Sequence, residues 1–262
     1  MREIENNKNL TPQDIINNPS LQTVKKHDGI LLDKSMLPSN GVFYPNDIYV
    51  TPFTGMDLKD LTNIEGSVNQ VLYKILSKRV QGVEITDILT NDKLWFIYYI
   101  RNITYKNRPI QIKCTCPECG AQSLHEFTFE KLNVEHYNNH LPSKQLKMPN
   151  EDMVEFTFPT IGTENAILRL KNNPANIEPI DDQFMLLASY IKTINGKKLT
   201  LWDAYNYVQG VDAMTFCFII NTLDKYTFTC DRTADFVCPE CGAKLSPIIE
   251  MDQEFFIPKL FN

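Results

Sequence analysis

The spacing of hydrophobic residues predicts an alternation of strands and helices that begins near residue 37. Residues 48–50 form a strand-like run after a cluster of turn-forming residues. Between residues 68 and 75, apolar side chains recur at the three- and four-residue spacing of one helix face. The segment 91–105 contains a seven-residue apolar run, 94–100, too short to cross a membrane and apolar on all sides. We expect this segment to be a buried central helix.

The same order of elements recurs in the second half of the chain. A strand-like segment at 154–158 is followed by a helical pattern at 182–194. A turn at Gly196 then precedes an apolar helix predicted at 211–223. The recurrence indicates that one structural unit is present twice.

Aligned residues indicate how the two copies correspond. Asp92 aligns with Asp212, 120 residues later. A period this long is that of a duplicated domain, because solenoid repeats span roughly 20–50 residues. We therefore predict an α+β fold of two diverged copies of a strand, helices and a β-hairpin. The first unit is expected at residues 37–134 and the second at residues 135–262.

Residues 1–36 are expected to form an extended N-terminal arm. They are rich in Asn and Lys and contain one helix signal, in which Thr11 can cap and Pro12 can occupy the first helical position. Such an arm either stays mobile or lies along a neighbouring subunit, and the sequence leaves both alternatives open. The N-terminus lacks the apolar core of a secretory signal, so we expect a soluble protein made in a cytoplasm.

Composition and charge indicate a globular chain and disfavour disulfides and nucleic-acid binding. The chain has 262 residues, of which 43% are hydrophobic and 22% charged, enough apolar material for one large or two small domains. Its seven cysteines, without an export signal, favour metal ligation over disulfides. A formal net charge of −6 and a pI of about 5.3 oppose binding to a polyphosphate backbone.

The sequence Cys-Pro-Glu-Cys-Gly occurs twice, and its four cysteines are the strongest chemical signal in the chain. It begins at Cys116, with Cys119 as the second thiol, and at Cys238, with Cys241 as the second thiol. Two cysteines separated by two residues can both bind one Zn²⁺ at about 2.3 Å, and the following glycine permits a tight turn. Four thiolates close the tetrahedron, so we predict a structural, zinc-ribbon-like site that joins the two units.

Other cysteines and two histidines are alternative ligands. Cys114 lies two positions before the first motif and could replace one of its thiols, or it is a buried apolar residue. His136 and His140 have the spacing of one helix face. They could complete a zinc finger with Cys116 and Cys119, or they lie on an exposed face. Cys217 is expected in the core of its apolar helix, and Cys230 on a strand.

Catalysis is the weakest of the candidate functions. The chain contains no phosphate-binding loop, dinucleotide-binding glycine motif, metalloprotease motif or nucleophile elbow. We therefore expect no enzyme, no catalytic residue and no small-molecule substrate. A zinc-ribbon regulator that binds nucleic acid is the alternative function, but Glu118 and Glu240 lie inside the motifs themselves, where a basic surface would be needed.

Part of the chain resembles the baseplate hub protein family of contractile-tailed, T-even-like bacteriophages. The resemblance is carried by Leu-Pro-Ser-Asn-Gly-Val-Phe-Tyr-Pro at 37–45, Asn-Asp-Lys at 91–93 and the motif at Cys116, and it covers roughly residues 37–129. It implies a non-enzymatic structural or assembly component of the virion tail baseplate, assembled in the host cytoplasm. It also implies hub and wedge proteins as partners, and no membrane or nucleic acid.

Overall fold

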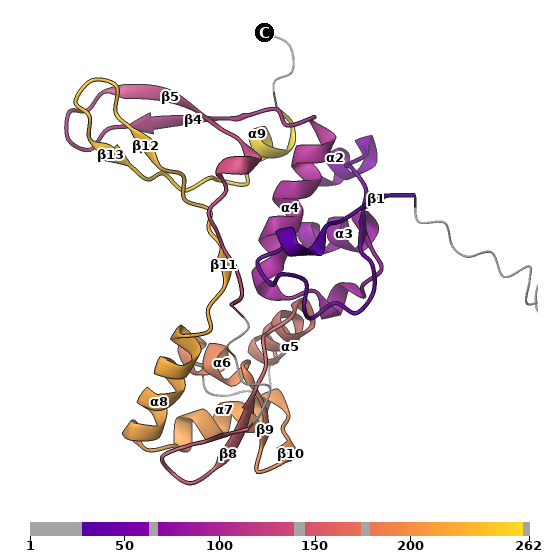
Figure 1. Ribbon diagram of the computed structural model, residues 1–262, viewed down its shortest axis with the longest axis vertical. Coiled ribbons are helices and arrows are strands. Elements are labelled where there is room, and N and C mark those ends of the chain that lie inside the picture. Colours follow the sequence, from indigo (N-terminus) through magenta and orange to yellow (C-terminus); the bar gives the residue numbers. More distant parts are fainter. Residues whose placement is uncertain (1–27, 63–67, 139–144, 174–178, 259–262) are drawn as a thin grey trace, which may run out of the picture.

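The computed structural model describes residues 28–62, 68–138, 145–173 and 179–258. It shows two lobes and a projecting arm (Figure 1). The first lobe contains α2, α3, α4 and α9, and the second lobe contains α5, α6, α7 and α8. The hairpin arm extends away from both lobes and is formed by β4 (Ile110–Thr115), β5 (Gln122–Phe127), β12 (Phe236–Val237) and β13 (Lys244–Leu245). These elements give a mixed α+β fold with small antiparallel sheets.

The first lobe contains a small three-stranded antiparallel sheet in the order β1-β2-β3. Its elements are β1 (Ile30–Leu31), η2 (Lys34–Met36), β2 (Tyr49–Val50), α2 (Gly55–Thr62), α3 (Val68–Arg79), β3 (Val80–Gln81), η3 (Ile85–Asp87), α4 (Thr90–Thr104) and α9 (Gln253–Phe256). The predicted strand at 48–50 and the predicted helix at 68–75 are thus confirmed.

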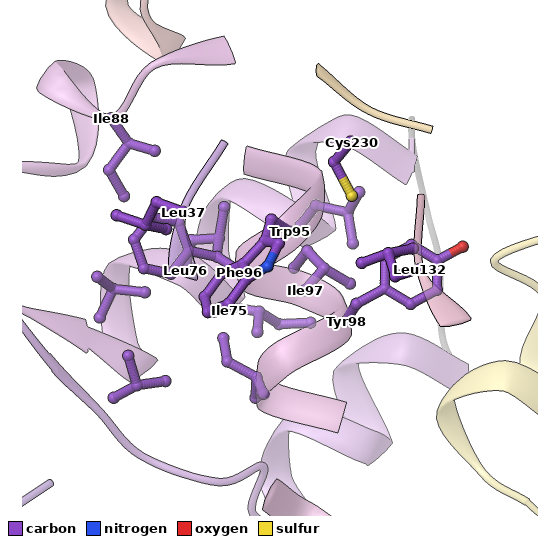
Figure 2. Packing of buried hydrophobic residues seen from close by; sticks show 14 of the residues in the cluster. Leu37, Ile75, Leu76, Ile88, Trp95, Phe96, Ile97, Tyr98, Leu132 and Cys230 are labelled. Atoms are coloured by element: carbon purple, nitrogen blue, oxygen red, sulfur yellow. The ribbon is translucent and has the colours of Figure 1, made fainter. Parts of the chain in front are cut away.

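Helix α4 is the centre of the first lobe. Trp95, Phe96 and Ile97 are buried within it, so successive positions all round the helix are covered. Figure 2 shows these side chains packed among residues from α3, from the segment before β2 and from β11. The prediction of a buried central helix is confirmed.

The second lobe packs four helices with a four-stranded antiparallel sheet in the order β10-β9-β8-β7. Its elements are β7 (Leu146–Lys147), β8 (Met153–Phe156), α5 (Ile161–Lys171), α6 (Asp182–Ala188), β9 (Ile191–Ile194), β10 (Lys197–Lys198), α7 (Leu201–Gly210) and α8 (Ala213–Asp224). The predicted helix at 182–194 is wrong after Ala188, because Ile191–Ile194 pairs with β8 as a strand. Asn195 and Gly196, both with positive φ, then form the hairpin turn to β10.

Contacts between distant residues join the lobes. Strands β6 (Val134–Glu135) and β11 (Thr229–Cys230) pair between them. Lys93 on α4 forms an ion pair with Glu164 on α5 at 2.6 Å, and the ring of Phe43 from the first lobe contacts Phe158 at 5.3 Å. The apolar core of the first lobe therefore includes residues from both halves of the chain, and the second lobe has a core of its own.

Part of the expected N-terminal arm belongs to the first lobe. Residues 1–27, with the helix signal at Thr11 and Pro12, lie outside the described residues. Ile30–Leu31 forms β1 and pairs with β2, and Leu32 is buried in the core of this lobe.

The segment 37–45 is fixed against α4 by a buried carboxylate. The backbone amide of Ser39 donates to Asp92 Oδ1 at 2.9 Å, and the Tyr44 hydroxyl donates to Asp92 Oδ2 at 2.7 Å. The Tyr44 oxygen accepts in turn from the amide of Leu89 at 3.0 Å. Burial raises the pKa of Asp92, against the lowering effect of these hydrogen bonds. The Leu-Pro-Ser segment thus has a structural role at the start of the central helix.

Replacing Gly41 with alanine should destabilise the protein by about 3 kcal/mol. Gly41 has φ +67, and a Cβ there would lie 2.3 Å from Lys34 Cβ. Gly196 is a matched control, because its φ is +77 but a Cβ would meet only a side-chain atom of Gln145 at 4.0 Å. Gly196→Ala should cost about 1–2 kcal/mol, from backbone strain alone. Urea unfolding of both variants measures the difference, and equal losses would contradict the predicted steric clash.

Candidate metal centre

The first cysteine motif lies at the turn of the longest hairpin in the described part of the chain. Strands β4 (Ile110–Thr115) and β5 (Gln122–Phe127) pair over six residues, and Cys116 follows β4 directly. The amide of Cys116 donates to the carbonyl of Ala121 at 2.9 Å, and the amide of Gly120 donates to the carbonyl of Cys116 at 3.0 Å. Gly120 has φ +71, which glycine adopts without steric cost. This turn places Cys116 and Cys119 on the same side of the hairpin end.

The second motif repeats this geometry on a shorter hairpin, β12 (Phe236–Val237) and β13 (Lys244–Leu245). The amide of Cys238 donates to the carbonyl of Ala243 at 2.8 Å, and the amide of Gly242 donates to the carbonyl of Cys238 at 3.0 Å. Gly242 has φ +75. The two motifs thus form the same tight turn.

The structure brings the four predicted cysteines together. Their sulfurs all lie within 4.8 Å of one another. Cys116 Sγ is 3.6 Å from Cys241 Sγ, and Cys119 Sγ is 3.7 Å from Cys238 Sγ. A disulfide requires about 2.05 Å, whereas four thiolates about 2.3 Å from one central ion would be about 3.8 Å apart. The observed spacing therefore suits a tetrahedral metal site and not a pair of disulfides.

The local electrostatics favour thiolate at one of the four positions. The backbone amides of Cys241 and Glu240 donate to the sulfur of Cys238 and lower the pKa of Cys238 to about 7. The thiolate is the form of cysteine that binds metal, so these amides favour coordination at Cys238. The pKa of Cys119 and that of Cys241 are raised despite a backbone hydrogen bond, because the neighbouring thiols and burial oppose it. Cys116 and Cys238 are buried, whereas Cys119 and Cys241 lie at the surface.

A small apolar cluster supports the sulfurs from the facing sides of the two hairpins. Cys114 and Leu245 are buried beside Cys116 and Cys238. The ring of His125 stacks on Phe236, with centroids 4.5 Å apart. Sequence reasoning missed this stacking contact, because His125 and Phe236 belong to different hairpins and have no spacing signal.

The alternative ligands lie elsewhere. Cys114 is outside the four-sulfur group, and its burial, which raises its pKa, keeps the thiol protonated. His136 Nδ1 is 2.9 Å from the carbonyl oxygen of Leu37, and His140 lies outside the described residues.

The predicted locations of the two remaining cysteines are correct in one case and wrong in the other. Cys230 is a buried residue of β11, as predicted. The prediction that Cys217 lies in the core is wrong, because it is on the exposed face of α8. The sequence alone did not identify which face of this apolar helix is covered.

Comparisons with known proteins identify a family. A model of the family described as T4 bacteriophage base plate protein matches residues 33–257, which span the first lobe, the second lobe and the hairpin arm. Searches of curated proteins and of solved structures found no match. Among the described residues, no helix is both long and apolar enough to cross a bilayer. The chain therefore belongs to the T4 bacteriophage base plate protein family.

Proposed function

We propose that this chain is a non-enzymatic structural or assembly component of the phage tail baseplate, stabilised by a structural zinc ion. Cys116, Cys119, Cys238 and Cys241 would hold the ion. The observation that carries the proposal is the convergence of four sulfurs, two from each hairpin, at tetrahedral spacing within a chain of this family. Four protein ligands leave no position for water or substrate, so the ion would fasten the hairpins together and perform no chemistry.

The zinc site would join two diverged copies of one unit, and the sheet topology supports this duplication. In the first lobe, β2 is followed by α2, α3 and β3, and the sheet order is β1-β2-β3. In the second lobe, β8 is followed by α5, α6 and β9, and β7, β8 and β9 are neighbours in the same order. Each unit then continues to a helix, α4 or α8, and a hairpin with the cysteine motif, although the second unit has β10 and α7 in addition before α8. Such agreement in element order supports common descent of the two halves.

The partners would be other baseplate proteins, and we place this chain in the hub. Family membership supports the class of partner. The surface of the hairpin arm disfavours nucleic acid, because Glu118 and Glu240 are exposed within the motifs themselves and would repel a polyphosphate backbone. The cysteine arrangement does not favour an enzyme, which would keep a coordination position open.

The zinc assignment is tested by elemental analysis of the purified protein. We expect one zinc per chain, because both motifs contribute to a single ion. A value of two, with each motif binding its own ion, would contradict the shared site, as would a metal-free protein that keeps the folded hairpin arm.

The baseplate assignment is tested in phage in which the gene for this chain is disrupted. As expected for a missing hub component, wedge subassemblies should accumulate without joining into a complete plate, as seen by electron microscopy. Supplying the intact chain in trans should restore complete plates. Normal baseplates formed in its absence would overturn the proposal.

A further inference from the structure

One stripe of α8 is apolar and exposed. Met214 is 71% exposed and Phe218 is 38% exposed, and Cys217 between them is also exposed. These positions have the i, i+3, i+4 spacing of one helix face. An adjoining face of α8, which includes Ile219, is buried in the second lobe. No element among the described residues buries the stripe.

The equivalent stripe of α4 is covered. With the separation of 120 residues between the repeats, Cys217 corresponds to Ile97 and Phe218 to Tyr98, both of which are buried. The Tyr98 ring contacts the ring of Phe255 from α9 with centroids 5.2 Å apart, in an edge-to-face arrangement. The first lobe therefore shows what fits against such a stripe.

The next position of the stripe binds the backbone of the same covering segment. Arg101 Nε donates to the carbonyl of Phe255 at 2.9 Å, and its guanidinium lies 5.4 Å from the centre of the Phe255 ring. The equivalent residue of α8 is Asn221, which is exposed and carries an amide that can donate to a carbonyl. Both stripes thus combine apolar side chains with one donor for a backbone carbonyl.

We propose that the Met214–Phe218 stripe of α8 is a docking site for a short aromatic segment of another baseplate protein. This inference rests on the proposed repeat and on the proposed class of partner. The segment would resemble α9, in which Phe255 and Phe256 are adjacent and both buried. The α9 segment of this chain already covers α4, so a second copy could not supply α9 to α8 without uncovering its own α4. We therefore assign the occupant to a different baseplate protein.

A peptide that reproduces residues 251–258 is the probe for this site. The fluorescently labelled peptide is titrated with the full-length protein while its anisotropy is measured. We expect saturable binding, with a dissociation constant on the order of a millimolar, because the contact is small and the peptide must be ordered. Phe218→Glu should weaken binding at least ten-fold. Leu168→Glu is the matched control, because Leu168 is an exposed apolar residue on α5, and it should bind as the wild type does.

Cys217 supplies a second measurement. Bound peptide should slow alkylation of Cys217 by a maleimide, as followed by mass spectrometry, in the wild type but not in Phe218→Glu. Circular dichroism establishes that the variants are folded.

The proposal is overturned if the wild type shows no saturable binding or if Phe218→Glu binds equally well. It is also overturned if sedimentation shows a wild-type dimer that this variant disrupts, because the stripe would then join two copies. Neither measurement depends on baseplate assembly, so failure here leaves the baseplate assignment standing.

Discussion

Replacing Cys238 with serine should abolish zinc binding and unfold the hairpin arm. Binding of a structural zinc contributes on the order of 10 kcal/mol to folding in small zinc domains, and a serine hydroxyl is a poor substitute for a thiolate. The cluster beneath the sulfurs has few buried members besides the ligands, chiefly Cys114 and Leu245. So small a core cannot keep two hairpins packed together without the metal.

The measurement is zinc content by elemental analysis, together with hydrogen exchange of the β4 and β5 amides. We expect zinc to fall from one per chain to less than about a tenth and the β4 and β5 amides to lose protection. Cys217→Ser is the matched control, because this thiol is exposed and remote from the four sulfurs, and both readouts should stay unchanged. Full zinc content in Cys238→Ser would rule out the proposed ligand set.

Replacing Asp92 with alanine should destabilise the protein by about 3–4 kcal/mol. The carboxylate is fully buried and accepts from the Ser39 amide and the Tyr44 hydroxyl. Its removal leaves both donors buried without a partner. Asp212, the repeat-equivalent residue, is the control, because it caps α8 at the surface by accepting from the amides of Met214 and Thr215. Asp212→Ala should cost about 1 kcal/mol in urea unfolding, and equal losses would contradict the role given to burial.

The pH dependence of the free energy of unfolding separates the contribution of the Asp92 charge from that of its hydrogen bonds. Burial raises the pKa of Asp92 above its ordinary value of 3.8, so the folded state binds this proton more tightly than the unfolded state. The contribution of Asp92 to the free energy of unfolding is therefore largest below about pH 4. It is lost as the pH rises through the raised pKa. Asp92→Asn lacks this titration. Urea unfolding at pH 4 and pH 7 should show the stability difference shifting in favour of the Asn variant at the higher pH.

The turn at each cysteine motif could be predicted from sequence because its geometry is local, and the near-identity of the two motifs was the signal that they share one site. Each motif specifies its own turn, and the glycine after the second cysteine adopts a positive φ in both copies. The central helix was equally evident from its continuous apolar run. These features depend on a few neighbouring residues, so the sequence pattern contains them completely.

Features that depend on distant partners were not predictable. Ile191–Ile194 continues an apolar pattern begun by a helix, and only its pairing with β8 makes it a strand. Cys217 lies in an apolar helix, but its exposure depends on what packs against α8. Asp92 acquires its role from Ser39, which is 53 residues earlier in the chain. In each case the deciding contact is tertiary.

The hairpin arm also determines how the chain would respond to mechanical load. Cys116 and Cys241 are 125 residues apart in sequence, yet their sulfurs meet, and the second lobe lies in the loop between them. With a metal bound, tension applied along the chain from residue 28 to residue 258 would pass through the metal–sulfur bonds and bypass that loop. The second lobe would then remain unstretched until coordination ruptures, which suits a protein of a phage baseplate that carries load.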